Sequence, residues 1–189
     1  MADKFQNKYR IASARLSCWD YSRQAAYFIT ICTQNRQHWF GAIRNGKMHL
    51  SEIGKIAEQE WVKTPGIRPD MNLALGEYII MPNHFHAIII IGDNAYNMNC
   101  GGVQNGSDAM HRVSTVNQFG PQSNNLASIV RGFKSAVTKN ARYIQSDFAW
   151  QSRYHDHIIR NDTSFHNISR YIRNNPSQWP EDRFYEKTI

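Results

Sequence analysis

Hydrophobic residues recur along this chain with two different periods, which predicts a fold that combines strands with helices. Stretches rich in β-branched and aromatic residues, bounded by polar and turn-forming residues, are typical of strands. The predicted strands are Ala26–Thr33, Asn72–Met81, His84–Ile91 and Tyr154–Arg160. The run Ile88–Ile91 shows no polar alternation, which indicates a strand that is covered on both faces.

Apolar residues at helical spacing predict three helices. Ser51 can cap the first of them, and Pro65-Gly66 breaks its pattern. The last one ends at Asn175-Pro176, because proline cannot continue a helix and biases the residue before it away from helical geometry. The predicted helices run from Glu52 to about Lys63, from Leu126 to Arg142, and from Asn161 or Asp162 to Asn175.

The order of these elements predicts an α+β fold that forms a single domain over residues 1–189. It corresponds to a ferredoxin-like sandwich, in which a mainly antiparallel sheet carries helices on one side and a further helix follows at the C-terminus. Asn45-Gly46 adds a tight hairpin between Ala42–Arg44 and Lys47–Leu50. Asn, Gly, Ser and Gln dominate Asp93–Asn124 without periodicity, so we expect a mobile loop there.

Composition and charge narrow the class of protein. The 189 residues are 41% hydrophobic, and 22 basic against 15 acidic residues give a formal net charge of +7, which favours a polyanionic partner without proving one. No apolar run reaches the roughly 20 residues of a membrane span, and the N-terminus has no signal-peptide core. Cys18, Cys32 and Cys100 form no CxxC pair, so we expect a cytoplasmic protein without a disulfide framework.

His84-Phe85-His86 is a candidate metal site. In an extended chain, residues i and i+2 share a face at roughly 6 to 7 Å, so both imidazoles point the same way while Phe85 packs on the opposite face. The pair alone also fits hydrogen-bonded structural histidines. A second pair, in His155-Asp156-His157, competes for the same role, although its central residue is acidic.

Tyr171 and Asn175 stand four residues apart on the last predicted helix and therefore share one face, beside an apolar ridge of Ile168 and Ile172. A tyrosine hydroxyl can serve as a nucleophile, and an asparagine oxygen is a suitable ligand for magnesium or manganese. A partly buried tyrosine beside a helix-ending asparagine is the alternative interpretation.

The strings MPNHFHAII, WQSRYHDHIIR and RYIRNNP, in this order and spacing, resemble the single-tyrosine HUH transposases, in particular the REP-associated tyrosine transposases and their insertion-sequence relatives. The resemblance spans most of the chain, from AYFITICTQNR to the Asn-Pro motif. It implies that His84 and His86 bind a divalent metal ion (Mg or Mn), that Tyr171 is the catalytic nucleophile, and that Asn175 is the third ligand.

The activity implied by this resemblance is cleavage and rejoining of single-stranded DNA, with hairpin ends, through a 5′-phosphotyrosine intermediate. Candidate residues for DNA contact or proton handling are His157, Arg153, Arg160 and Tyr154. A homodimer is compatible with the resemblance, whereas a membrane is not an expected partner. A domesticated, non-catalytic DNA-binding protein and a metal-dependent phosphoesterase that uses water remain alternatives.

Overall fold

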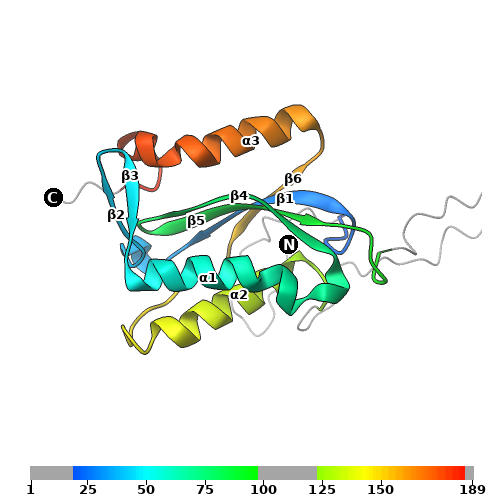
Figure 1. The fold of residues 1–189 in the computed structure, drawn as a ribbon, viewed down its shortest axis with the longest axis horizontal. Helices are drawn as coiled ribbons and strands as arrows, with labels where there is room; N and C mark the ends of the chain where they lie inside the picture. Colours follow the sequence, from blue (N-terminus) through cyan, green and yellow to red (C-terminus); the bar gives the residue numbers. More distant parts are fainter. Residues whose placement is uncertain (1–18, 98–122, 186–189) are drawn as a thin grey trace, which may run out of the picture.

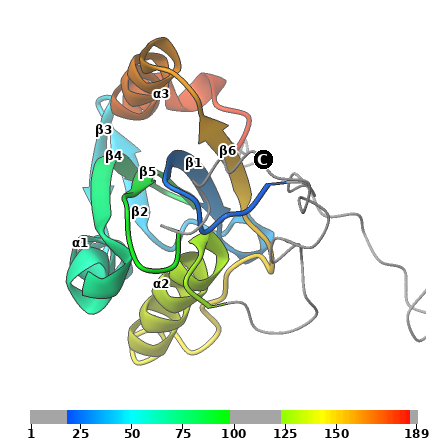
Figure 2. The same cartoon turned by 90° about the vertical axis from the view of Figure 1, so that its right-hand side faces the viewer.

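The computed structural model describes residues 19–97 and 123–185, which build a four-stranded antiparallel sheet with helices on both faces (Figures 1 and 2). The strands are β1 (Ala25–Cys32), β4 (Leu73–Met81), β5 (His84–Ile91) and β6 (His155–Ile159). Their spatial order, β4-β5-β1-β6, is that of a ferredoxin-like fold. Since β5 lies inside the sheet, it is buried almost throughout, as its continuous apolar run predicts.

The predicted hairpin at Asn45-Gly46 is confirmed. Strands β2 (Gly41–Arg44) and β3 (Lys47–Leu50) pair antiparallel around it. Asn45 has φ of 51° and Gly46 has φ of 69°, the backbone conformation that a two-residue hairpin turn requires. Helix α1 (Glu52–Ile67) begins immediately afterwards, where the Gly54 N–H donates to the Ser51 hydroxyl at 3.1 Å.

The end of α1 differs from the sequence prediction, because the helix passes through Pro65 and stops at Ile67 rather than at about Lys63. Proline has a φ that suits a helix, and Pro65 leaves one helical hydrogen bond unmade at a point where only two more helical residues follow. The Arg68 N–H donates to the Pro65 carbonyl at 3.1 Å and closes the helix. Two short 3-10 helices also occur in this half of the chain, η2 (Gln34–Arg36) and η3 (Pro69–Met71).

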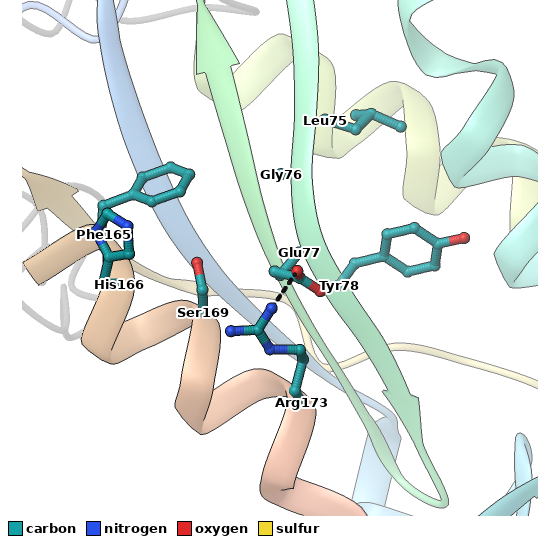
Figure 3. A pocket seen from close by; sticks show the side chains of 8 residues that line it. All are labelled: Leu75, Gly76, Glu77, Tyr78, Phe165, His166, Ser169 and Arg173. Atoms are coloured by element: carbon teal, nitrogen blue, oxygen red, sulfur yellow. Dashed lines mark hydrogen bonds and ion pairs between the residues drawn. The ribbon is translucent and has the colours of Figure 1, made fainter. Parts of the chain in front are cut away.

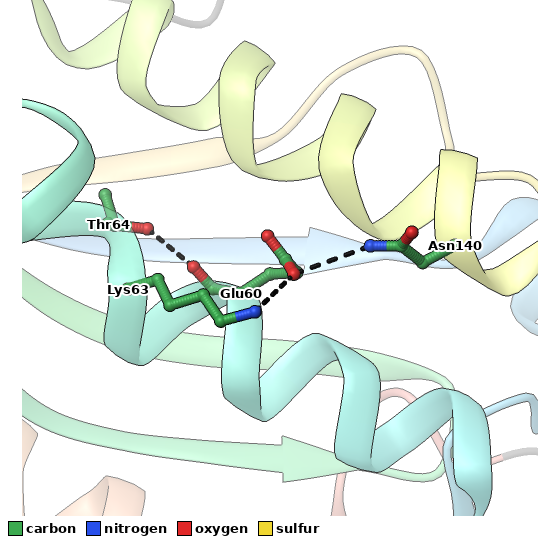
Figure 4. Close-up of polar contacts among 4 residues, drawn as sticks. All are labelled: Glu60, Lys63, Thr64 and Asn140. Carbon is green, nitrogen blue, oxygen red and sulfur yellow. Dashed lines mark hydrogen bonds and ion pairs between the residues drawn. The ribbon is translucent and has the colours of Figure 1, made fainter.

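Helices α1 and α2 (Leu126–Ala141) pack side by side on one face of the sheet (Figure 2). The core beneath them includes the rings of Trp61, Phe85 and Phe133, whose centroids lie 5.0 to 5.3 Å apart. A polar contact joins the two helices, since Asn140 of α2 donates to the Glu60 carboxylate of α1, which also accepts from Lys63 of the same helix (Figure 4). This layer supports the sheet from the side opposite to the histidine pair.

Helix α3 (Asp162–Asn174) lies across the other face of the sheet (Figure 1). Asn161 caps it by accepting from the Ser164 N–H at 2.8 Å, and Ile172 docks it against Ile88 and Ile159. The expectation that Pro176 keeps Asn175 out of helical geometry is wrong, since Asn175 has φ of −54° and ψ of −41°. Its N–H bonds to the Ile172 carbonyl, and the chain continues as the 3-10 helix η5 (Asn175–Glu181).

The predicted loop over Asp93–Asn124 falls mostly on residues 98–122, which lie outside the described residues. Its first residues are held in place by buried amides. Asn94 donates to the Met71 carbonyl at 3.1 Å, and Asn97 donates to the Ser22 carbonyl at 3.1 Å. None of the helices within residues 19–97 and 123–185 combines the length and apolar character needed to cross a membrane.

Candidate active site

The histidine pair opens β5, directly after the Pro82-Asn83 turn that connects it to β4. Both imidazoles are buried on the α3 face of the sheet, and their ring centroids lie 4.5 Å apart. Phe85 points to the other face and contacts Trp61. The alternation of an extended strand thus places the two histidines together and anchors them from behind.

Each imidazole has one nitrogen oriented by a neighbouring polar side chain. The His84 Nδ1–H donates to Asn83 Oδ1 at 2.9 Å, and His86 Nδ1 lies 2.8 Å from Thr30 Oγ1. Such bonds fix the ring orientation and direct Nε2 toward a shared space. In that space, His84 Nε2 is buried without a hydrogen-bond partner among the described residues.

Burial and nearby positive charge keep both imidazoles neutral. Desolvation, with smaller contributions from Arg183 and Arg36, lowers the pKa of His84 to about 3. Desolvation also lowers the pKa of His86 well below its usual value, and the neighbouring His84 adds to this shift. Neutral imidazole is the form that binds metal ions, so the pair is prepared for that role over the physiological pH range.

Tyr171 reaches the pair from α3, with its hydroxyl 3.2 Å from His86 Nε2. Its ring meets the Phe28 ring edge-on, and 39% of the residue remains exposed to solvent. Desolvation and the negative charge of Asp182 raise the pKa of Tyr171, while Arg183 and a side-chain interaction with Asn175 lower it. The phenol is therefore half-buried, with its hydroxyl at the histidine pair and part of the side chain open to solvent.

Asn175 lies at the same site, buried at the junction of α3 and η5. Its Nδ2 donates to Asp182 Oδ2 at 2.9 Å, which leaves Asn175 Oδ1 buried and without a partner among the described residues. Asp182 is a site residue that the sequence analysis missed. Nothing local marks it, because only the return of the chain through η5 brings it back to the start of β5.

The donor set fits a divalent cation. Within residues 19–97 and 123–185, His84, His86 and Asp182 form the one group of His, Cys, Asp and Glu residues with metal-binding spacing, with ligand atoms all within 4.8 Å of one another. The unpartnered His84 Nε2 and Asn175 Oδ1 are further reasons to expect an ion, because buried polar atoms rarely lack a partner. Imidazole nitrogen with carboxylate and amide oxygen is a common combination for divalent metals.

Residues 182–185 form one wall of the site. The Phe184 ring lies against the His84 ring with centroids 4.5 Å apart, and the Phe184 carbonyl accepts from Asn83 Nδ2 at 2.9 Å. Arg36 donates to the Arg183 carbonyl at 3.0 Å. The C-terminal segment is thus held against the histidine pair at several points.

The remaining predicted residues lie farther from this group. His157 and its neighbour His155 are exposed on β6, opposite Phe28 and Thr30 of β1, and therefore share the face of His86. They do not belong to the group formed by His84, His86 and Asp182. Arg153 and Arg160 are exposed at the two ends of β6. Tyr154 packs against the core beneath α1 and α2, so the structure does not bring it to the site.

Comparison with solved structures defines the fold class. The structure of a REP-associated tyrosine transposase bound to a REP hairpin matches with a TM-score of 0.58 and 17% identity, over 89% of this chain and 74% of that one. The chain thus has the fold of a REP-associated tyrosine transposase, as its motifs imply. A putative transposase from Deinococcus radiodurans matches with a TM-score of 0.40 and 11% identity, over 88% of this chain and 97% of that chain.

Sequence comparison supplies the family. No family model matches the chain. An uncharacterized protein of Haemophilus influenzae is 37% identical to it over 174 residues, which cover 92% of both chains. The chain belongs to the same family as this Haemophilus protein.

Proposed function

We propose that this protein is a metal-dependent enzyme that cleaves and rejoins single-stranded DNA, with Tyr171 as nucleophile. The observation that carries the proposal is the position of the Tyr171 hydroxyl, 3.2 Å from His86 Nε2 and beside a metal-binding set. The solved transposase of the same fold is bound to a REP hairpin. We therefore propose DNA with hairpin ends as the substrate.

The proposed ligands of the ion are His84, His86, Asp182 and the Asn175 amide oxygen, with magnesium or manganese as the metal. When bound, such an ion supplies Lewis-acid stabilisation of the negative charge on the reacting phosphate. Thr30 and Asn83 orient the two imidazoles. Asn175 has a second task, since its side-chain N–H group holds the Asp182 carboxylate in place.

In the proposed reaction, the Tyr171 oxygen forms a bond to phosphorus and the bond from phosphorus to the 3′ oxygen breaks. The phenol loses its proton, the departing 3′ oxygen gains one, and the 5′ phosphate remains on Tyr171. Because burial raises the pKa of Tyr171, the phenol is protonated at neutral pH and its deprotonation is part of the activation barrier. Attack by a 3′ hydroxyl reverses the step and rejoins DNA.

The test is incubation of the wild type and Tyr171→Phe with 5′- and 3′-labelled single-stranded hairpin oligonucleotides and Mn²⁺, followed by denaturing gels. We expect a covalent adduct on the 3′ fragment that Tyr171→Phe abolishes. Tyr143→Phe is a matched control, because Tyr143 is 83% exposed at the end of α2. Cleavage by Tyr171→Phe without an adduct would indicate hydrolysis by water, and binding without cleavage by the wild type would indicate a DNA-binding protein.

A further inference from the structure

A groove runs between α3 and the edge strand β4, on the flank of α3 that faces away from Tyr171. It has a volume of about 520 Å³, and its lining combines polar side chains with the apolar residues Leu75, Tyr78 and Phe165 (Figure 3). The residues that line it from the two elements include Glu77, Phe165, His166, Ser169 and Arg173. Volumes of this size are typical of small-molecule and nucleotide sites.

A β-bulge shapes the β4 wall of the groove. The pairing register shifts between Leu75 and Tyr78, so that Gly76 and Glu77 together occupy one position of the ladder. A Cβ atom on Gly76 would lie 2.9 Å from Ile88 Cβ, so glycine allows this close approach. Bulges redirect side chains, and here Glu77 meets Arg173 across the groove, with Oε1 3.1 Å from Nη1 (Figure 3).

Two polar atoms of α3 are available to a ligand in the groove. Ser169 is only 5% exposed, yet its hydroxyl has no hydrogen-bond partner in the described part of the chain. A buried hydroxyl without a partner lowers stability, so a ligand that satisfies it gains binding free energy. His166 Nδ1–H donates to the Asp162 carbonyl at 2.7 Å, which leaves Nε2 as an acceptor.

The pattern of charge and hydrogen bonding selects the ligand. The paired charges of Glu77 and Arg173 offset each other, which does not favour an anion such as phosphate. A carboxylate beside a guanidinium instead matches a base edge that carries N–H donors next to a carbonyl acceptor. Guanine has this edge, since its N1–H and N2–H can donate to Glu77 while O6 accepts from Arg173. The Phe165 and His166 rings provide surfaces for base stacking.

We propose that the groove between α3 and β4 binds one unstacked guanine of the DNA strand that is cleaved at Tyr171. The inference rests on the proposed function and adds a specificity site to it. Glu77 and Arg173 recognise the base edge, and Ser169 supplies a further hydrogen bond. The helix thus carries the nucleophile on one flank and a base-recognition site on the other.

Fluorescence anisotropy with labelled 12-mer oligonucleotides tests the proposal without requiring cleavage. The probes are oligothymidine and the same strand with one central dG, each measured with the wild type, Glu77→Ala and Arg173→Ala. We expect the wild type to bind the dG strand about tenfold more tightly, and both variants to lose this preference. Replacing dG by deoxyinosine, which lacks the N2 amino group, should weaken binding to the wild type.

Arg170→Ala is the matched control. Arg170 is exposed on the same helix and does not line the groove. Arg170→Ala removes the same positive charge as Arg173→Ala and should preserve the dG preference. Equal binding of both strands by the wild type, or a preference that survives in Glu77→Ala and Arg173→Ala, would overturn the inference while leaving the Tyr171 adduct untouched. Failure of the wild type to bind either strand would count against the proposed function itself.

Discussion

At the scale of single residues, each candidate metal ligand is oriented by a hydrogen bond from or to a neighbouring side chain. His84 and His86 are oriented by Asn83 and Thr30, and Asp182 is oriented by Asn175. Each imidazole is therefore held through its Nδ1 atom, and both oxygens of the Asp182 carboxylate accept hydrogen bonds, Oδ2 from Asn175 and Oδ1 from the Phe184 N–H. This arrangement reduces the conformational entropy that metal binding must remove.

Replacing Asp182 by Ala tests its role as a ligand. We expect about tenfold weaker binding of Mn²⁺ or more, because the variant loses a charged oxygen and leaves the Asn175 amide without its partner. Isothermal titration calorimetry of the metal-free protein measures this affinity. Glu181→Ala is the control, since Glu181 is the adjacent, exposed carboxylate. Equal Mn²⁺ affinities of the two variants would remove Asp182 from the site.

At the scale of elements, helix α3 carries different side chains on its two flanks, and strand β4 adds Glu77 to one of them. The flank of α3 toward β1 and β5 carries Tyr171, and the flank toward β4 carries Ser169 and Arg173. Residues two positions apart on a helix differ by about 200°, so these side chains point to opposite sides. The bulge in β4 matters because it turns Glu77 toward the second flank.

Gly76→Ala tests the bulge. The added methyl group would meet Ile88 at 2.9 Å inside a packed sheet, and we expect the free energy of unfolding to fall by about 1 to 3 kcal/mol. Gly66→Ala is the control, because a methyl group added there in α1 would have nothing within 4 Å of it and alanine favours a helix by about 1 kcal/mol. Urea unfolding curves compare the two, and equal stabilities would contradict the account of the bulge.

At the scale of the whole molecule, the site is an assembly of distant segments. Thr30 comes from β1, His86 from β5, Tyr171 from α3 and Asp182 from the end of η5. Two imidazoles are buried in this assembly and remain neutral, so their protonation is coupled to global unfolding. The site therefore makes the stability of the metal-free protein depend on pH.

The pKa of His84 is about 3 in the folded chain and about 6.5 when unfolded. Between these pH values the unfolded state binds the extra proton, so stability is complete above pH 6.5 and decreases as the pH falls toward 3. The expected slope is about 1.4 kcal/mol per pH unit for this histidine. Urea unfolding of the metal-free wild type and His84→Asn measures it, and an unchanged slope in the variant would refute the argument.

Features that depend on the regular spacing of residues within one strand or helix could be predicted from the sequence. The strands, the helices, the shared face of His84 and His86, and the placement of Tyr171 and Asn175 at one site follow from spacings of two and four residues. The end of α1 and the helical backbone of Asn175 could not be predicted. The local preference of proline against helical geometry is outweighed there by hydrogen bonds that the folded chain makes.

The sequence by itself thus determined which segments form strands and helices and which side chains share a face, since backbone geometry sets these periods. The structure added that α3 covers the sheet face opposite to α1 and α2 (Figures 1 and 2). Only the tertiary structure decided the partners of those side chains. Asp182 at the histidine pair, Thr30 at His86, and Glu77 at Arg173 are contacts between residues far apart in the chain. No local pattern encodes them, because they depend on strand order, on the bulge in β4, and on the path of η5 back to β5.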